Sequence, residues 1–332
     1  MSRKHHLLDE DDIRVRPQRG KSRPRSKDRP LHADALTGTV LTVDRGRFTL
    51  LLDDGTGMYA VKARELGRKG IVVGDRVDVV GDITGDTDTQ GRIIRRLERT
   101  STLRRTAEDT DPVERIIVAN ATRLAVVTAT VDPEPRTGLI DRALVAAYDA
   151  GVEPMLILTK TDLKAADELL SLYGPLDVPV YEITRKEVPD SLRDALTDEA
   201  TVLVGHSGVG KSTLVNNLVP SAGRSTGHVN AATGRGRHTS TSVMALPLPQ
   251  GGWIIDTPGI RSFGLAHVDV GRVINAFPDL AALTGDCPRS CSHDEPDCAL
   301  NRVTSVNGLV RVDSLRRLIR SRSASVEDES AF

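Results

Sequence analysis

Short apolar runs separated by turn residues dominate the chain from Leu36 to residue 100. The runs alternate with clusters of Gly and Asp, such as Asp53-Asp54-Gly55, that are typical of tight turns. Five runs have the length and composition of β-strands: Gly38–Val43, Arg47–Leu52, Met58–Val61, Arg76–Val80 and Arg92–Leu97. Five short strands in so short a stretch predict a small closed β-barrel over residues 35–100, of the oligonucleotide/oligosaccharide-binding (OB) type.

The pattern becomes that of an α/β domain after a polar stretch at residues 99–112, which we interpret as a linker. The run Leu139–Ala150 has helical apolar spacing and predicts a helix that ends at Gly151. Continuous apolar runs predict buried strands at Leu124–Thr128, Met155–Leu158, Val178–Ile183, Thr201–Val204, Ser242–Leu248 and Trp253–Ile255. Alternation of such strands with helices predicts a mainly parallel sheet covered by helices.

A glycine-rich segment, Gly205–Ser212, lies between one of these strands and the predicted helix Thr213–Leu218. It has the pattern Gly-x4-Gly-Lys-Ser, whose backbone N–H groups surround the phosphates of a nucleotide. We expect Lys211 to reach the terminal phosphates as a catalytic residue, and Ser212 to hold Mg²⁺. The other predicted nucleotide contacts are Gly205, His206, Ser207, Gly208, Val209, Gly210 and Thr213. A glycine-rich turn without a phosphate is the alternative.

A second motif, Thr159-Lys160-Thr161-Asp162, follows a predicted buried strand and is similar to the guanine-binding pattern Asn-Lys-x-Asp. A carboxylate at Asp162 can accept hydrogen bonds from N1 and the amino group of guanine, whereas adenine does not offer these donors. A buried site that leaves polar groups unpaired discriminates strongly against the wrong base. We expect all four residues to contact the nucleotide. The alternative is that Asp162 only caps a helix.

Two further segments predict the switch elements of a nucleotide hydrolase. Residues 221–241 form a long polar loop in which Thr239 is expected to complete the Mg²⁺ shell and to sense the terminal phosphate, with Ser240 and Thr241 as close alternatives. The segment Asp256–Gly259 has the form Asp-x-x-Gly, so we expect Asp256 to hold Mg²⁺ through water and the Gly259 N–H to meet the γ-phosphate. A turn without chemistry is the alternative for this second segment.

All three cysteines of the chain lie within twelve residues, together with a histidine. The set is Cys287, Cys291, His293 and Cys298. Three thiolates and one imidazole suit a tetrahedral Zn²⁺ ion, and because all four positions are filled the zinc would be structural. Unmetallated thiols in a loop are the alternative.

Composition and charge indicate the number of domains and the cellular location that we expect. The chain has 332 residues, enough for two or three domains, and no apolar stretch approaches the ~20 residues that span a bilayer. The N-terminus has no signal-peptide core, so we expect a cytoplasmic protein without membrane contact. Residues 13–30 carry eight Lys or Arg against a single Asp and cannot bury enough surface to order themselves. This tail, residues 1–34, either contacts nucleic acid phosphates or only solubilises the chain.

Basic residues also occur on the predicted barrel and on the last helix. Those of the barrel are Arg45, Arg47, Lys62, Arg64, Arg68, Lys69, Arg92 and Arg95. Those of the helix are Arg311, Arg316, Arg317, Arg320 and Arg322. Aromatic residues make up only 3% of the chain, so contact with the backbone of structured RNA suits the barrel better than base stacking. A purely structural barrel and a solvated helix face are the alternatives.

The order of the motifs is unusual, because the guanine motif precedes the phosphate loop. Ordinary GTPases have the reverse order, so the sequence predicts a circularly permuted GTPase domain over residues 101–266. With Gly236–Thr241, these motifs and the Cys/His cluster make the chain resemble the ribosome small-subunit-dependent GTPase family (RsgA/YjeQ) over about residues 35–320. The resemblance implies an OB-type barrel, an α/β P-loop GTPase domain and a zinc-binding α-helical domain over residues 267–332.

The same resemblance implies a function. It implies a monomeric GTPase that binds the 30S ribosomal subunit and its 16S rRNA, acts in late maturation, and hydrolyses GTP to GDP and phosphate with stimulation by that particle. Ile260 stands where other GTPases have a water-orienting glutamine, so His238 is a candidate for that catalytic role. Contact of His238 with phosphate or RNA is an equal alternative.

Two other functions are compatible with these residues. The missing glutamine and the Thr at position 159 would suit a non-hydrolysing RNA-binding scaffold clamped by nucleotide. A P-loop ATPase or kinase is a third possibility, and Asp162 argues against it.

Overall fold

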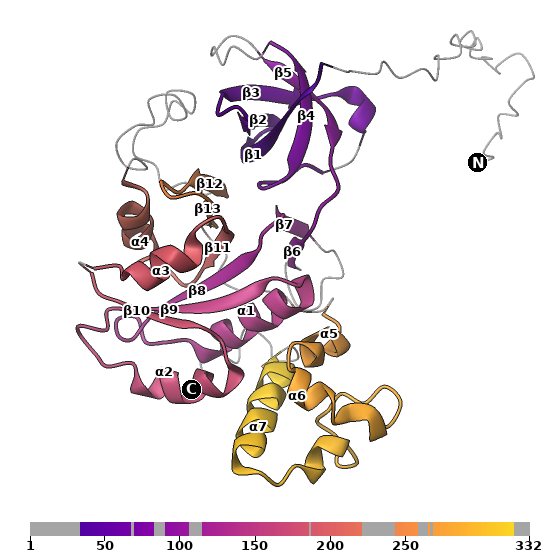
Figure 1. Cartoon of the computed structure of the whole chain (residues 1–332), viewed down its shortest axis with the longest axis vertical. Coiled ribbons are helices and arrows are strands. Elements are labelled where there is room, and N and C mark those ends of the chain that lie inside the picture. The colour runs from indigo at the N-terminus through magenta and orange to yellow at the C-terminus, as the bar shows by residue number, and fades with distance from the viewer. Residues whose placement is uncertain are drawn as a thin grey trace, which may run out of the picture. The chain divides into compact units, whose positions relative to one another are not determined.

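A computed structural model describes residues 34–67, 70–82, 90–105, 115–185, 187–220, 243–257, 265 and 268–321 (Figure 1). The predicted basic tail therefore lies outside the described residues, apart from Asp34. Among the described residues, no helix has both the length and the apolar character needed to cross a membrane. The domain boundaries expected from the sequence remain predictions.

Five strands close into the barrel that the turn pattern predicts. They are β1 (Leu36–Asp44), β2 (Arg47–Leu52), β3 (Gly57–Lys62), β4 (Arg76–Gly81) and β5 (Gly91–Arg96), with the short 3₁₀ helix η2 (Arg64–Leu66) between β3 and β4. The strand order β1-β2-β3-β5-β4 is closed by pairing of β1 with β4, and only β3 and β5 are parallel. This is the strand arrangement of an OB-type Greek-key barrel. Val40, Leu50, Val77 and Ile93 lie in its core.

A bulge in β1 gives neighbouring residues different environments. Val40 pairs with Leu50 and Thr42 with Thr49, so Leu41 is the extra residue. Val40 faces the barrel core, whereas Leu41 belongs to the large core cluster that contains Leu124. Thr42 pairs with Met244 of β12 (Met244–Pro247), so hydrogen bonding continues from the barrel into the strands beyond it.

The predicted polar linker at residues 99–112 is wrong in its first half. Thr102–Arg105 forms strand β6, which pairs with β7 (Arg115–Ala119) in a separate two-stranded sheet. Leu103 is fully buried, and the Arg99 guanidinium forms a buried ion pair with Asp75 at 2.6 Å. The polar composition is explained by this pairing with groups far along the chain, which local composition does not reveal.

The part of the continuous 11-stranded sheet that lies beyond the barrel has the mainly parallel architecture that the apolar runs predict. Its order is β10-β9-β8-β11-β13-β12, and only β12 is antiparallel to its neighbour. The strands not yet defined are β8 (Arg123–Ala129), β9 (Glu153–Thr159), β10 (Val180–Ile183), β11 (Ala200–Val204) and β13 (Trp253–Asp256). Because β8, β9 and β10 precede the central strand β11 in the chain, the strand order is that of a circularly permuted P-loop domain.

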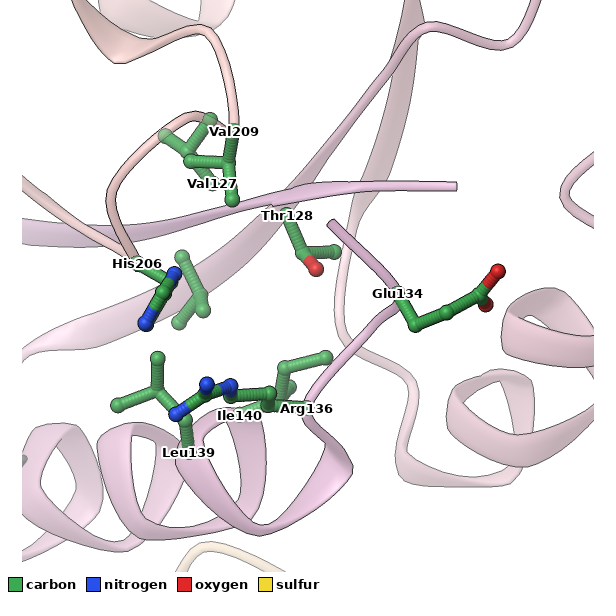
Figure 2. A pocket seen from close by; sticks show the side chains of 9 residues that line it. Val127, Thr128, Glu134, Arg136, Leu139, Ile140, His206 and Val209 are labelled. Atoms are coloured by element: carbon green, nitrogen blue, oxygen red, sulfur yellow. The ribbon is translucent and has the colours of Figure 1, made fainter. Parts of the chain in front are cut away.

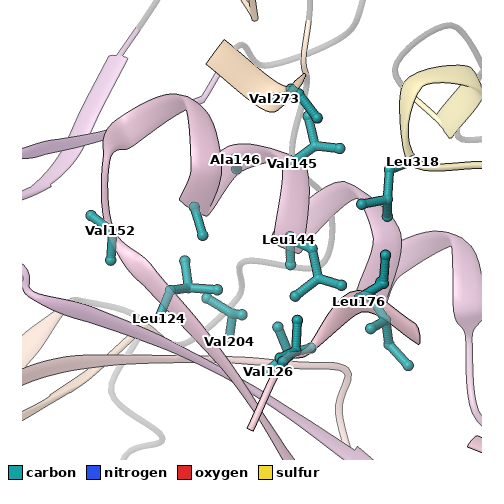
Figure 3. Close-up of a cluster of buried hydrophobic side chains, with 14 of the residues drawn as sticks. Leu124, Val126, Leu144, Val145, Ala146, Val152, Leu176, Val204, Val273 and Leu318 are labelled. Atoms are coloured by element: carbon teal, nitrogen blue, oxygen red, sulfur yellow. The ribbon is translucent and has the colours of Figure 1, made fainter. Parts of the chain in front are cut away.

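Alternate residues of the strands face two different cores. Leu124 and Val126 of β8 pack with α1 (Thr137–Ala150), whereas Ala125 and Val127 pack with α3 (Asp190–Leu196) and α4 (Lys211–Leu218). Figure 3 shows the first cluster, in which side chains of β8, β11, α1, α5 and α7 meet. The sequence did not predict α2 (Asp167–Tyr173) or the 3₁₀ helix η3 (Gly174–Leu176).

The C-terminal part is helical and loop-rich, as expected. It contains α5 (Val270–Asn275), α6 (Pro278–Ala281), η5 (Thr284–Asp286), η6 (Ala299–Arg302) and α7 (Val306–Ser321). Helix α7 packs on α1, and the buried Arg142 of α1 donates a 2.9 Å hydrogen bond to the carbonyl of Ser321 at the end of α7. A cation at a helix C-terminus is favourable because the last carbonyls carry partial negative charge.

Four of the basic residues expected on the last helix are paired with neighbouring groups. Arg311 bonds Asp279 at 2.7 Å, Arg317 bonds Asp141 at 3.0 Å and Arg320 bonds Asp294 at 2.6 Å. Arg316 donates to the carbonyl of His293, while Arg322 lies outside the described residues. These contacts fasten α7 to its surroundings, and both RNA contact and a solvated face stay predictions for this helix.

The barrel arginines are partly engaged as well. Arg95 is paired with the buried Asp78, and the Arg47 guanidinium lies 4.1 Å from the centre of the Tyr59 ring. Arg68 and Lys69 lie outside the described residues. The expectation of RNA contact through the barrel stays a prediction for all eight residues.

Candidate nucleotide site and metal centre

The glycine-rich segment Gly205–Ser212 connects β11 to α4, in the strand–loop–helix context that a phosphate loop requires. Gly205 and Gly210 have φ angles of 152° and 97°. A Cβ on Gly205 would lie 2.2 Å from the carbonyl oxygen of Val127, so the loop can approach β8 only with glycine there. Lys211 and Ser212 begin α4, where the helix N-terminus favours an anion.

Lys211 and Asp256 form the charged centre of this site. The Lys211 ammonium donates to the carbonyls of Gly205 and His206, at 2.5 and 2.9 Å. Burial lowers the pKa of Lys211, and the nearby Asp256 carboxylate opposes this shift. Burial likewise raises the pKa of Asp256, and Lys211 and the Thr257 N–H oppose it. Two half-buried opposite charges thus adjoin the loop.

The residues present suit a magnesium–phosphate group. The Oδ1 atom of Asp256 is buried and has no hydrogen-bond partner in the described part of the chain. A buried carboxylate oxygen is costly unless a donor or a cation satisfies it. Ser212 is exposed at the start of α4, so its hydroxyl is accessible. Ser212 and Asp256 are therefore the described residues that could hold Mg²⁺ beside the loop.

The second motif lies next to the phosphate loop. The Thr159 hydroxyl, which is buried at the end of β9, donates a 2.6 Å hydrogen bond to the carbonyl of Val209. Lys160 has a left-handed backbone, with φ 60°, and its ammonium donates to the carbonyl of Asp132. Asp162 is exposed at the edge of the same loop, and the Thr161 hydroxyl donates to the carbonyl of Ile183 at 3.3 Å. The structure thus brings the two motifs together through one direct hydrogen bond.

Sequence reasoning missed one residue of this arrangement. Thr130 directly follows β8. Its N–H donates to the carbonyl of Thr159 and its hydroxyl donates to the carbonyl of Lys160, each at 3.0 Å. The available signal was a hydroxyl residue directly after a buried strand, because the carboxyl ends of neighbouring parallel strands meet at one edge of a sheet. Three predicted residues, His238, Thr239 and Gly259, lie outside the described residues.

Replacing Thr159 by valine should weaken nucleotide binding several-fold. Valine has nearly the same shape but leaves the buried Val209 carbonyl without its donor, which costs about 1–3 kcal/mol. Serine at the same position keeps the hydroxyl and should retain most of the affinity. Titration of a fluorescent GDP analogue into both variants measures the difference. Equal affinity of the valine variant and the unmodified chain would show that the hydrogen bond from Thr159 to Val209 does not support the phosphate loop.

The Cys/His cluster forms a compact centre in the C-terminal part. The ligand atoms of Cys287, Cys291, His293 and Cys298 all lie within 4.8 Å of one another. The sulfurs of Cys287 and Cys298 are 3.9 Å apart, and each lies 3.7 or 3.9 Å from Nδ1 of His293. Metal–sulfur bonds of about 2.3 Å in a tetrahedron place two sulfurs about 3.8 Å apart. The cluster therefore has the size of a tetrahedral metal site.

The loop that carries the cluster is held by neighbouring polar groups. The Glu295 carboxylate accepts from the N–H of Ser292 at 2.9 Å and from the Cys291 thiol at 3.1 Å. Arg316 of α7 donates to the carbonyl of His293 and to Asn301. These contacts give the closely spaced ligands a defined geometry, as partners around metal ligands commonly do.

Comparisons with known proteins agree with this architecture. The model of the family described as RsgA GTPase matches residues 96–266. Small ribosomal subunit biogenesis GTPase RsgA of Pseudomonas aeruginosa (strain PAO1) is 40% identical over 243 residues, which is 70% of this chain and 71% of that protein. The protein of the same name from Nitrosomonas europaea is 38% identical over 282 residues, 82% of this chain and 87% of the relative.

Two solved structures have the same fold. YjeQ from Thermotoga maritima has a TM-score of 0.61 and 23% identity, over 86% of this chain and 99% of that one. YloQ, described as a circularly permuted GTPase, has a TM-score of 0.62 and 24% identity, over 89% of this chain and 98% of that one. The permuted order deduced from the motifs is confirmed.

Proposed function

Because the chain belongs to the RsgA GTPase family, we propose that it binds the small ribosomal subunit, acts in late assembly of that particle, and hydrolyses GTP to GDP and phosphate faster when bound to it. The observation that supports this most is the joined site, in which the Thr159 hydroxyl holds the Val209 carbonyl of the phosphate loop. Membership of a GTPase family argues against the non-hydrolysing scaffold.

The residues have distinct roles in the proposed reaction. Asp162 accepts hydrogen bonds from guanine, and the aliphatic part of Lys160 lies along the base. The loop amides and Lys211 bind the phosphates and stabilise the charge that develops on them. Ser212 and Asp256 hold Mg²⁺, which when bound neutralises phosphate charge. Thr239, Gly259 and the water-orienting role of His238 stay predictions from the sequence.

We also propose that the Cys/His cluster holds one structural zinc ion. The support is the ligand set, three thiols and one imidazole, which zinc prefers in closed tetrahedral sites. A monomeric state, a cytoplasmic location and contact with 16S rRNA stay predictions from the sequence.

The test is the GTP hydrolysis rate of the full chain with and without purified 30S subunits, across a series of salt concentrations. We expect stimulation by the subunits that declines steeply as salt rises, because contacts with RNA phosphates release counterions. A rate that 30S subunits leave unchanged at every salt concentration would contradict the proposed function.

Replacing Asp162 by alanine should remove the preference for GTP over ATP. The variant loses two hydrogen bonds to a charged acceptor, so guanine affinity should fall by about 3 kcal/mol, roughly a hundredfold. Dissociation constants for GDP and ADP measure this, with Asp167→Ala, an exposed carboxylate at the start of α2, as the matched control. Survival of guanine preference in the Asp162 variant would show that this carboxylate does not recognise the base.

A further inference from the structure

A pocket lies beside the phosphate loop, between β8 and the first turn of α1 (Figure 2). Its volume is about 240 Å³ counted out to the open mouth, and its enclosed part has room for a single oxygen-sized group. Val126, Leu139 and Val209 form apolar walls, and Thr128, Arg136 and His206 supply polar groups. None of the nucleotide or metal roles described above uses Thr128 or Arg136.

Thr128 is the strongest indication of a ligand. The residue is only 5% exposed, and no hydrogen bond of its hydroxyl occurs among the described residues. Figure 2 shows the hydroxyl turned into the pocket rather than toward the protein. The hydroxyl is accessible through the pocket on a residue that is otherwise buried, so a polar occupant can bond to it.

Positive charge lies at the pocket, close to the start of a helix. Arg136 immediately precedes the 14-residue helix α1, no side chain caps this end, and the Arg136 guanidinium has no ion-pair partner in the described part of the chain. In Figure 2, Arg136 and His206 both extend into the pocket. A helix N-terminus with an adjacent guanidinium is a favourable site for an anion.

Two neighbouring groups modify this charge. The Nδ1 atom of His206 lies 2.9 Å from the carbonyl of Ser207, which leaves Nε2 free to bond a ligand. Glu134 lies at the rim as the acidic residue of the pocket, and the Lys164 ammonium lies 3.7 Å from its carboxylate. Lys164 is equally close to Glu168 and so offsets Glu134 only in part, which leaves Arg136 as the cation of the lining.

We propose that this pocket binds inorganic phosphate, the second product of GTP hydrolysis, while GDP occupies the phosphate loop. The site rests on the proposed function for its role, because hydrolysis generates phosphate at the loop to which His206 and Val209 belong. One phosphate oxygen accepts from the Thr128 hydroxyl in the enclosed part, and the others face Arg136 and His206 at the mouth. The pocket then receives the product beside the place where it forms.

The test measures phosphate binding to the full chain saturated with GDP and Mg²⁺, by calorimetric titration with inorganic phosphate at constant ionic strength. We expect Arg136→Gln to weaken binding about tenfold and Thr128→Val about fivefold, in keeping with a charged and a neutral hydrogen bond. Thr128→Ser should bind like the unmodified chain. Arg193→Gln, which removes one charge from α3 on the other face of the sheet, is the matched control and should have no effect.

The outcomes separate this site from the phosphate loop and from the proposed function. If phosphate does not bind, or binds equally to Arg136→Gln, Thr128→Val and the unmodified chain, the pocket is not the site and the proposal is overturned. Binding in the presence of GDP requires no turnover, so a chain that binds phosphate there but does not hydrolyse GTP would overturn the proposed function alone. Product inhibition by phosphate that Arg136→Gln relieves would support both.

Discussion

Replacing Lys211 by alanine should reduce GTP turnover at least a hundredfold while leaving the fold intact. The Lys211 ammonium is the described cation next to Asp256, and burial has already lowered its pKa, so part of its hydration is lost before any ligand binds. A desolvated ammonium stabilises developing phosphate charge more strongly than one in water. Removing one such preorganised donor typically costs about 10²- to 10³-fold in rate.

The fold should survive because of where Lys211 lies. Among the described residues its ammonium donates to the carbonyls of Gly205 and His206, and alanine is favourable at the start of α4. Phosphate release gives the rate, and circular dichroism with thermal unfolding gives the structure. Lys62→Ala, which removes an exposed ammonium from β3 of the barrel, serves as the control and should keep basal turnover. Normal turnover in the Lys211 variant would show that the proposed phosphate site is wrong.

The parts of the molecule that depend on local pattern were predictable from the sequence. Short apolar runs alternate with turn residues along the barrel segment, so each strand and its turn lie close together in the sequence. The phosphate loop contains its glycines, lysine and serine in eight consecutive positions. The guanine motif precedes the phosphate loop, and this order alone predicts a circularly permuted domain. In each case the information lies within one short stretch, so no distant contact needs to be known.

The sequence reveals less about residues whose partners lie in other elements. Residues 102–105 have linker composition but pair with β7, and the arginines of α7 look like a basic surface but bind carboxylates such as Asp141 and Asp279. Composition tells which polar groups a segment contains. The role of each polar residue depends on the group with which it pairs in the folded chain. The same limit hid Thr130, which supports the guanine motif from a neighbouring strand.

Thr159 departs from the Asn of the guanine-binding pattern and still makes a specific hydrogen bond within the site. Judged from the sequence alone, Thr in place of Asn weakened the guanine motif. In the structure its hydroxyl is buried and reaches the phosphate loop, so one short side chain joins the two motifs. At this position the structure has a hydrogen bond from the Thr159 hydroxyl to the Val209 carbonyl, which an asparagine amide would have to replace.

Replacing Cys298 by serine should release the metal and unfold the segment around it. The Cys298 side chain is 2% exposed and packs in the same cluster as Leu300, Leu315 and Leu318, so the ligand is also part of a core. Structural zinc in small sites contributes an apparent binding free energy of order 10 kcal/mol, comparable with the whole stability of a domain. A weaker ligand at this position should lose most of that contribution.

The unfolding should spread along a definite path. Arg316 bonds the carbonyl of His293 within the metal loop, and α7 in turn packs on α1, so the loop supports the helix that contacts the nucleotide domain. We expect zinc content near zero and fast amide hydrogen exchange over residues 278–321, with slow exchange retained in β8 and β11. The matched control Ala299→Ser adds the same hydroxyl one residue away and should keep one zinc per chain. Full zinc content and undiminished protection in the Cys298 variant would remove the claim that this cluster is a structural metal site.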